Sequence, residues 1–124
     1  MLVEFEYRGN ICVLHLEGRF ATGQDSLYLH TKTEELKTSG FVKILVDFAG
    51  VDYVDSTGIG FLIGIYTSVK KSPLGQFALV NTNRRVREVL ELTRLAQVLQ
   101  IYPDEAAALK ALDSGGKTSA SQAS

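Results

Sequence analysis

Residues Lys43 to Lys71 read KILVDFAGVDYVDSTGIGFLIGIYTSVKK, and this stretch decides the fold of the chain. The apolar run from Ile44 to Phe48 is short and rich in β-branched residues, which predicts a buried strand. A turn that carries Asp52 and Asp55 is expected to follow it. Ser56 is then expected to begin a helix, because serine is a preferred N-cap residue and the apolar residues after it recur at helical spacing.

The predicted helix after Ser56 is more apolar than a helix that lies on a sheet requires. Its apolar arc contains Ile59, Leu62, Ile63 and Tyr66, extended by Phe61, Ile65 and Val69. A helix on a sheet needs an apolar stripe of only about 100° or a little more. Two explanations stay open: neighbouring helices cover the surplus, or part of it is left for a partner or a second copy of the chain. Gly60 and Gly64 lower helix propensity, so close backbone contact is the expected compensation.

The flanking sequence predicts strands that alternate with helices. Before the central stretch, strands are expected at Val3–Tyr7 and at Ile11–Glu17, the second ended by Gly18, followed by a helix at about Gln24–Thr38. After it come a strand at Gln76–Val80, a helix at about Arg84–Glu91, a strand at Gln97–Tyr102 and a helix at Asp104–Leu112. This order predicts an α/β fold with a mostly parallel or mixed sheet that helices cover.

Length and composition predict one soluble domain. The chain has 124 residues, of which 45% are hydrophobic and 22% are charged. We expect the domain to span residues 1–112, and residues 113–124, which lack apolar periodicity, to form a disordered tail. The net charge of −1 argues against nucleic acid or an anionic membrane as a partner. The single cysteine and the lack of a membrane-spanning or signal-peptide pattern favour a cytoplasmic location.

The turn after the central strand carries a family resemblance. Asp55-Ser56-Thr57-Gly58-Ile59-Gly60, preceded by Val46-Asp47 and Val51-Asp52-Tyr53-Val54, resembles the signature of STAS domains. The match is closest to the stand-alone bacterial anti-sigma factor antagonists, in which the serine directly after the aspartate is phosphorylated by a partner kinase. The resemblance extends from the first strand to about Leu112. It implies a small mixed β-sheet opened by a β-hairpin, with about five strands and four helices.

The resemblance also implies a function, which is that of a regulatory binding module and not of an enzyme. The unphosphorylated form would bind an anti-sigma factor serine kinase and so release a sigma factor. Phosphorylation of Ser56 would end the interaction, and a serine phosphatase would restore it. No cofactor, metal or catalytic residue is expected. The predicted partner-binding residues are Thr22, Asp55, Ser56, Thr57, Gly58, Ile59, Phe61, Leu62 and Ile65.

The position of Ser56 supports such a switch on physical grounds. A serine there could merely cap the helix, a role worth about 1 kcal/mol, but Asp55 could cap it equally well and leave the hydroxyl free. A phosphate at a helix N-terminus meets free N–H groups and the positive end of the dipole, so the fold should survive. Its added charge of about −1.5 to −2 would weaken docking, because it would repel an acidic partner surface and would have to be desolvated in an apolar interface. Whether Thr57 replaces Ser56 as the acceptor stays open.

Two other functional hypotheses deserve comparison. In the first, the chain is a constitutive STAS scaffold of a transporter or signalling complex, with Ser56 only a cap. In the second, Asp47, Asp52 and Asp55 form a Mg²⁺ site of a receiver-like domain. A receiver-like domain also needs an acidic pair after its first strand and a late lysine. Gly18-Arg19-Phe20 and Tyr102-Pro103 occupy those places, so solvated turn carboxylates are favoured.

The remaining reactive side chains suggest no active site. His15 and His30 lack a second ligand at metal spacing, and Cys12 is expected in the core. Arg84, Arg85 and Arg87 form a basic patch on a helix start. The chain departs from the family pattern at Gly18-Arg19-Phe20-Ala21, where an acidic residue is usual, and at Arg94, where glycine is usual. These differences concern partner choice more than the fold.

Overall fold

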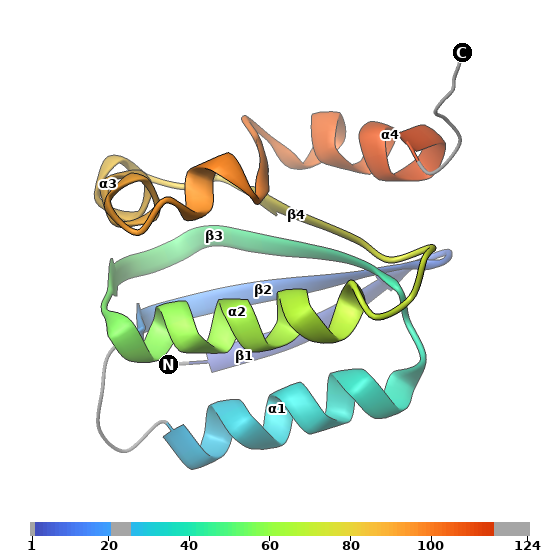
Figure 1. Cartoon of the computed structure of the whole chain (residues 1–124), viewed down its shortest axis with the longest axis horizontal. Coiled ribbons are helices and arrows are strands. Elements are labelled where there is room, and N and C mark those ends of the chain that lie inside the picture. Colours follow the sequence, from blue (N-terminus) through green and yellow to red (C-terminus); the bar gives the residue numbers. More distant parts are fainter. Residues whose placement is uncertain (1, 21–25, 116–124) are drawn as a thin grey trace.

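A mixed five-stranded sheet with helices on both faces forms the protein (Figure 1). The computed structural model describes residues 2–20 and 26–115, and at Phe20, Ser26, Ser56, Thr57 and residues 113–115 it describes the backbone alone. The strands are β1 (Leu2–Arg8), β2 (Ile11–Phe20), β3 (Lys43–Val54), β4 (Gln76–Val80) and β5 (Gln100–Tyr102). The helices are α1 (Ser26–Ser39), α2 (Ser56–Val69), α3 (Arg84–Leu92) and α4 (Glu105–Gly115), with a short 3₁₀ helix, η1 (Leu95–Gln97). This architecture confirms the predicted α/β class and the mixed sheet.

The sheet follows the order of the sequence. Its strands lie in the order β1-β2-β3-β4-β5. β1 and β2 are antiparallel and form the predicted hairpin, whose Gly9 has a φ of +61° that favours glycine. The other neighbouring pairs are parallel, so β2, β3 and β4 all end at the same edge of the sheet. That edge leads into α2 and α3.

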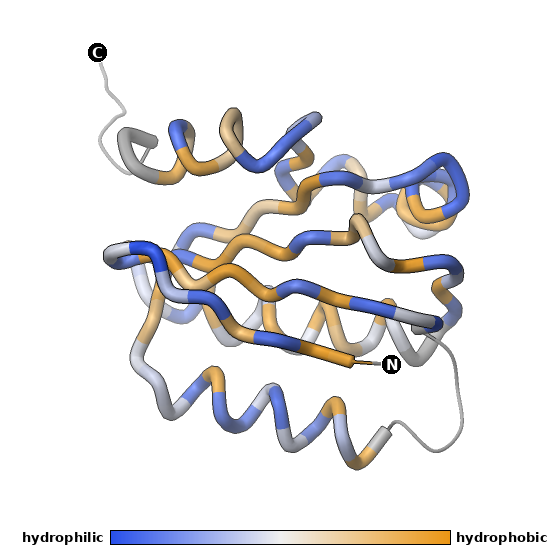
Figure 2. Tube along the Cα trace, turned by 180° about the vertical axis from the view of Figure 1, so that it is seen from behind, coloured by the Kyte–Doolittle hydropathy of each residue, from blue (hydrophilic) through white to orange (hydrophobic). Residues whose placement is uncertain are grey.

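The helices divide between the two faces. In Figure 1, α1 and α2 lie on one face and α3 and α4 on the other. The larger apolar core joins α1 and α2 to the sheet and also includes Val86 and Leu90 of α3. Leu14, Leu62 and Leu79 are among its fully buried members. A smaller cluster under α4 joins Val13, Leu45 and Val80 to Ala108 and Leu112. Figure 2 shows hydrophobic residues running along the central strands of the sheet between these layers.

The central strand is longer than the sequence predicts. β3 continues through Asp52 to Val54, so the predicted turn at Asp52 was wrong. The reason is pairing: β2 does not end at Gly18 but runs on to Phe20 and supplies partners for the second half of β3. The register shifts on both sides of Glu17–Gly18, and Gly18 has a φ of +100°. Opposite this irregularity, a Cβ on Gly50 would lie 2.9 Å from the carbonyl oxygen of Leu16, so glycine is required there.

Other boundaries differ by a few residues. β4 has the predicted limits, whereas the last strand begins at Gln100 and not at Gln97, because η1 occupies the preceding residues. Arg94, which stands where the family has glycine, adopts a left-handed backbone with φ +64°. α4 continues to Gly115, past the predicted limit at Leu112, and residues 116–124 of the predicted tail lie outside the described residues.

One contact closes part of the edge of the sheet. The hydroxyl of Tyr28, on α1, accepts a hydrogen bond from the backbone N–H of Val3 at 3.0 Å. The same hydroxyl lies 3.4 Å from the carbonyl oxygen of Val3, to which it donates. Both backbone groups of Val3 on the outer edge of β1 therefore have a partner within the chain.

None of the helices within the described ranges is both long and apolar enough to cross a membrane.

Candidate functional site

The junction between β3 and α2 holds the residues that the sequence singled out. Asp55 is the single residue between the two elements. Its carbonyl oxygen accepts the N–H of Ile59 at 3.0 Å, which is the first hydrogen bond of the helix. Asp55 therefore occupies the N-cap position, and Ser56 is the first helical residue, which confirms the predicted helix start and gives the cap to Asp55.

This arrangement supports the electrostatic argument about Ser56. The first N–H groups of a helix have no partner within the helix, and the positive end of its dipole lies beside them. The backbone of Ser56 stands in that first turn. Thr22, another predicted binding residue, lies outside the described residues.

Most of the predicted partner-binding residues of α2 are buried. Ile59, Phe61, Leu62 and Ile65 are buried, with Leu62 fully inaccessible, because α1 and the sheet cover them. Gly58 is buried as well. In the chain alone these residues therefore belong to the core, and their part in a partner surface stays a prediction. Of the two explanations for the long apolar arc, neighbouring elements account for most of it.

A different strip of α2 faces outward. It consists of Gly60, Ile63, Gly64 and Thr67, and we call it the exposed α2 strip. Ile63 keeps 43% of its surface exposed, although the sequence placed it on the apolar arc. A Cβ on Gly60 or Gly64 would meet no atom of the described residues within 4 Å, so the expected close backbone contact is not present there. The glycines leave room for another molecule to approach the helix.

Basic side chains lie at the same edge of the sheet as the β3–α2 junction. Arg19, near the end of β2, places its guanidinium 4.7 Å from the ring centre of Tyr53 on β3. Arg84, Arg85 and Arg87 are exposed on the first turns of α3. Asn83 fixes the start of this helix, because its side chain accepts the N–H of Val86 and donates to the carbonyl of Val51, both at 2.9 Å.

A network of polar side chains crosses the face of the sheet on which α4 lies. His15 on β2 places Nδ1 2.7 Å from Oδ2 of Asp47 and Nε2 2.6 Å from Oε1 of Glu6. The other oxygen of Asp47 accepts from the side chain of Asn81 at 2.8 Å and from the N–H of Ala49 at 2.9 Å. Arg8 bonds Glu6 at 2.8 Å, which extends the network along β1.

The network alters the pKa values of its members. Burial opposes the charge on His15, but its hydrogen bonds to Glu6 and Asp47 outweigh burial and raise the pKa above 6.5. Burial also disfavours the charge on Asp47, yet the hydrogen bonds from Asn81, Ala49 and His15 lower its pKa. The hydrogen bonds from His15 and Arg8 lower the pKa of Glu6. All three groups are thus stabilised in their charged forms.

Sequence reasoning missed this network and described His15 as isolated. Its partners are distant along the chain, with Asp47 lying 32 residues away. A signal was available, however. His15 shares the alternation of Val13 on β2, and Asp47 shares that of Leu45 on β3, so the two belong to one face of neighbouring strands.

The metal hypotheses find little support in the described residues. The group of three possible ligands there is Glu6, His15 and Glu105, whose donor atoms lie within 4.8 Å of one another. Arg8 already contacts both glutamates, with Glu105 at 2.9 Å, so a cation occupies this place. Asp47 is committed to His15 and Asn81, and it forms no such group with Asp52 and Asp55. Burial raises the pKa of Cys12 to about 11, as expected of a core thiol.

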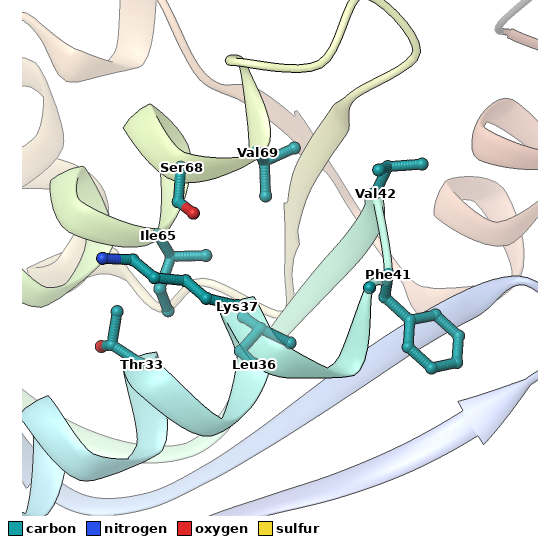
Figure 3. A pocket seen from close by; sticks show the side chains of 9 residues that line it. Thr33, Leu36, Lys37, Phe41, Val42, Ile65, Ser68 and Val69 are labelled. Carbon is teal, nitrogen blue, oxygen red and sulfur yellow. The ribbon is translucent and has the colours of Figure 1, made fainter.

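A small pit opens between the C-terminal parts of α1 and α2 (Figure 3). Its volume is about 150 Å³, and it is lined mainly by Leu36, Phe41, Val42, Ile65 and Val69, with Thr33, Lys37 and Ser68 among the polar residues. Pockets that hold small-molecule ligands usually measure about 300–1,000 Å³. The pit is thus too small for a typical cofactor, and it lies at the opposite end of α2 from Ser56.

Comparison with known proteins places this geometry in a family. The STAS domain model matches residues 3–108. A candidate anti-sigma factor antagonist from Thermotoga neapolitana is 38% identical over 77 residues, which cover 62% of this chain and 67% of that protein.

Solved structures agree with this match. The crystal structure of a candidate anti-sigma factor antagonist from Thermotoga maritima has a TM-score of 0.82 at 25% identity and covers 90% of this chain and 94% of that one. The Bacillus cell fate determinant SpoIIAA in its phosphorylated form has a TM-score of 0.67 at 19% identity, over 88% of this chain and 98% of that one.

Proposed function

We propose that this chain, which belongs to the STAS domain family, is an anti-sigma factor antagonist that phosphorylation of Ser56 switches off. In its unphosphorylated form it binds an anti-sigma factor that is also a serine kinase, and the sigma factor is released. The kinase then transfers a phosphate to Ser56 and ends the interaction, and a serine phosphatase reverses the modification. The observation that carries the proposal is the position of Ser56 as the first residue of α2, directly after the N-cap Asp55.

The fold can accept a phosphate at this position. A phosphate on the first residue of a helix meets N–H groups that the helix leaves unpaired, and the dipole favours its charge. Exposed arginines of α3 begin at the same edge of the sheet and add positive charge there. Phosphorylation should therefore leave the domain folded and act on its surface.

The docking surface starts at this junction and continues along the exposed α2 strip. Ile63 offers an apolar contact, and Gly60 and Gly64 allow the partner to approach the backbone of the helix. A dianion at the end of this strip would have to lose its water when the partner docks. It would also repel acidic groups on the partner. Binding is thus weakened while the antagonist keeps its fold.

The test uses the cognate anti-sigma factor with four variants. The chain and Ser56→Ala should bind it with similar affinity, whereas Ser56→Asp should bind at least about tenfold more weakly. With ATP, intact-mass analysis should detect one added phosphate on the chain and on Thr57→Ala, but none on Ser56→Ala. Ile63→Lys should lose binding and keep its unfolding midpoint.

Two results would contradict the proposal. Equal binding by Ser56→Ala and Ser56→Asp, together with a complex that ATP does not dissolve, would favour the constitutive scaffold. Loss of the added phosphate in Thr57→Ala alone would move the acceptor to Thr57.

A further inference from the structure

We propose that His15 is a proton-dependent clamp between the β1–β2 hairpin and β3, which opens on its Glu6 side when the imidazole loses a proton. This inference does not depend on the proposed function, because it concerns the opposite face of the sheet from α2. It rests on the hydrogen bonds of one side chain.

The geometry requires a charged imidazole. Both ring nitrogens of His15 lie within hydrogen-bonding distance of a carboxylate, Nδ1 at 2.7 Å and Nε2 at 2.6 Å. Carboxylates at neutral pH only accept hydrogen bonds, so each nitrogen must carry a hydrogen. A neutral imidazole has one N–H, and its second nitrogen would turn a lone pair toward a carboxylate. The clamp can therefore be complete only in the protonated state.

The surroundings of His15 decide which contact is lost. The side chain of Asp47 is 12% exposed and is also held by Asn81 and Ala49, so it cannot easily exchange its partner for water. The side chain of Glu6 is 40% exposed and keeps its bond to Arg8. A neutral His15 should thus keep its hydrogen on Nδ1, facing Asp47. Glu6 then moves away into solvent.

The other charged groups near His15 do not change which of its two contacts is lost. On β1, Glu4 lies opposite His15 in the strand register, and Arg8 follows Glu6. On α4, Glu105 lies within 4.8 Å of the donor atoms of Glu6 and His15 and is paired with Arg8. β2 contributes the exposed Glu17 on the other side of Leu16. The carboxylates outnumber Arg8, so their summed field favours the proton on His15.

The consequence is local to the edge of the sheet. Glu6 belongs to β1, and its contact with His15 reaches across to β2. When this contact opens, β1 keeps its backbone pairing but loses a side-chain tie to the centre of the sheet. Asp47 and Asn81 stay in place, so the start of α3 should not respond.

The experiment is an NMR titration of the whole chain, followed at the ring nitrogens of His15. Ring nitrogen shifts should give His15 a pKa above its ordinary value of 6.5, and above that pKa they should place its remaining hydrogen on Nδ1. Glu6→Gln should lower the pKa of His15, because it removes the charge that faces Nε2, while the matched control Glu91→Gln should leave that pKa unchanged. Amide exchange in β1, corrected for its intrinsic pH dependence, should rise across the titration of His15 more than in β4.

Each readout can overturn the inference. It is wrong if the pKa of His15 is 6.5 or lower, if neutral His15 carries its hydrogen on Nε2, or if Glu6→Gln does not lower the pKa of His15. Equal changes of exchange in β1 and β4 would also contradict an opening confined to the hairpin.

Discussion

The two faces of the sheet are held together by different interactions. On the face covered by α1 and α2, Leu14, Val46 and Leu79 of the sheet pack in one core with Leu62 and other buried apolar residues of α2. On the other face, α3 also contributes to the larger core, but the smaller apolar cluster under α4 is followed, toward the hairpin, by the polar network of His15, Asp47 and Glu6. Burial of apolar surface is insensitive to pH, whereas a charged network depends on the protonation of its members. The first face should therefore set the overall stability, and the second its response to pH.

This division also locates the proposed switch. Ser56 begins the helix that contributes the most residues to the larger core. Because these residues hold α2 in place, a charge added at Ser56 should not displace the helix. The polar network lies on the opposite face and can change without moving α2. Substitutions on the two faces provide direct tests of this separation.

The largest loss in the free energy of unfolding is expected from Leu62→Ala. Leu62 is fully buried between α2 and the sheet, and removing a buried leucine side chain typically costs about 2–5 kcal/mol of the free energy of unfolding. Ile63→Ala, at the next residue of the same helix, should cost well under half as much because its side chain is 43% exposed. Urea unfolding of both variants measures the difference. Similar losses would mean that the two sides of α2 are not distinct.

A smaller loss is expected from Asp47→Asn on the other face. The amide keeps the shape but removes the charge that faces His15, and leaving a buried polar partner unsatisfied costs about 1–3 kcal/mol. Asp52→Asn is the control, since Asp52 is exposed on the same strand and should change stability by less than about 0.5 kcal/mol. If the control lost as much as Asp47→Asn, the network would not be the cause.

Asn83→Ala tests the connection between the sheet and α3. The substitution removes the helix cap on Val86 and the bond to Val51, with an expected loss of about 1–2 kcal/mol. Arg84→Ala, one residue later and strongly exposed, should be nearly neutral. Thermal unfolding followed by circular dichroism distinguishes the two, and a neutral Asn83→Ala would show that backbone pairing alone positions α3.

The smallest effect is the pH dependence of stability. The pKa of His15 is raised in the folded protein, so its contribution is complete below its ordinary value of 6.5 and is lost as the pH rises through the folded pKa. The pKa of Asp47 is lowered, so its contribution is present above its ordinary value of 3.8 and is lost as the pH falls through the folded pKa.

Stability should accordingly be greatest between these limits. His15→Gln should flatten the alkaline decline and leave the profile of the chain otherwise similar, as measured by urea unfolding at a series of pH values. A decline of equal slope in His15→Gln would assign it to another group.

The sequence predicted those elements whose signals are local. The alternating and continuous apolar runs located β1, the start of β2, β4 and the start of α2 to within a residue or two. The extension of β3 past Phe48 was missed because Ala49-Gly50 and Asp52 favour a turn locally, and only the pairing with β2 keeps this segment extended. Non-local pairing overrides local preference in such cases.

The sequence predicted where the candidate site lies better than it predicted which residues of the site are exposed. The Asp55-Ser56 motif located the junction, yet a helical wheel does not say which half of an apolar arc meets the sheet. Phe61 and Ile65 were therefore assigned to a partner surface although they are core residues, and Ile63 was not. The tie between His15 and Asp47 needed the strand register, which the sequence alone does not supply.

The hydrogen bonds between Tyr28 and Val3 protect the edge of the sheet against aggregation. An unprotected outer strand invites other chains to continue the sheet, which is how ordered aggregates grow. A phenol that satisfies both backbone groups of Val3 obstructs such growth at the start of β1. The start of β1 is therefore protected from pairing with another chain, which leaves the helices as the surface for the reversible binding proposed above.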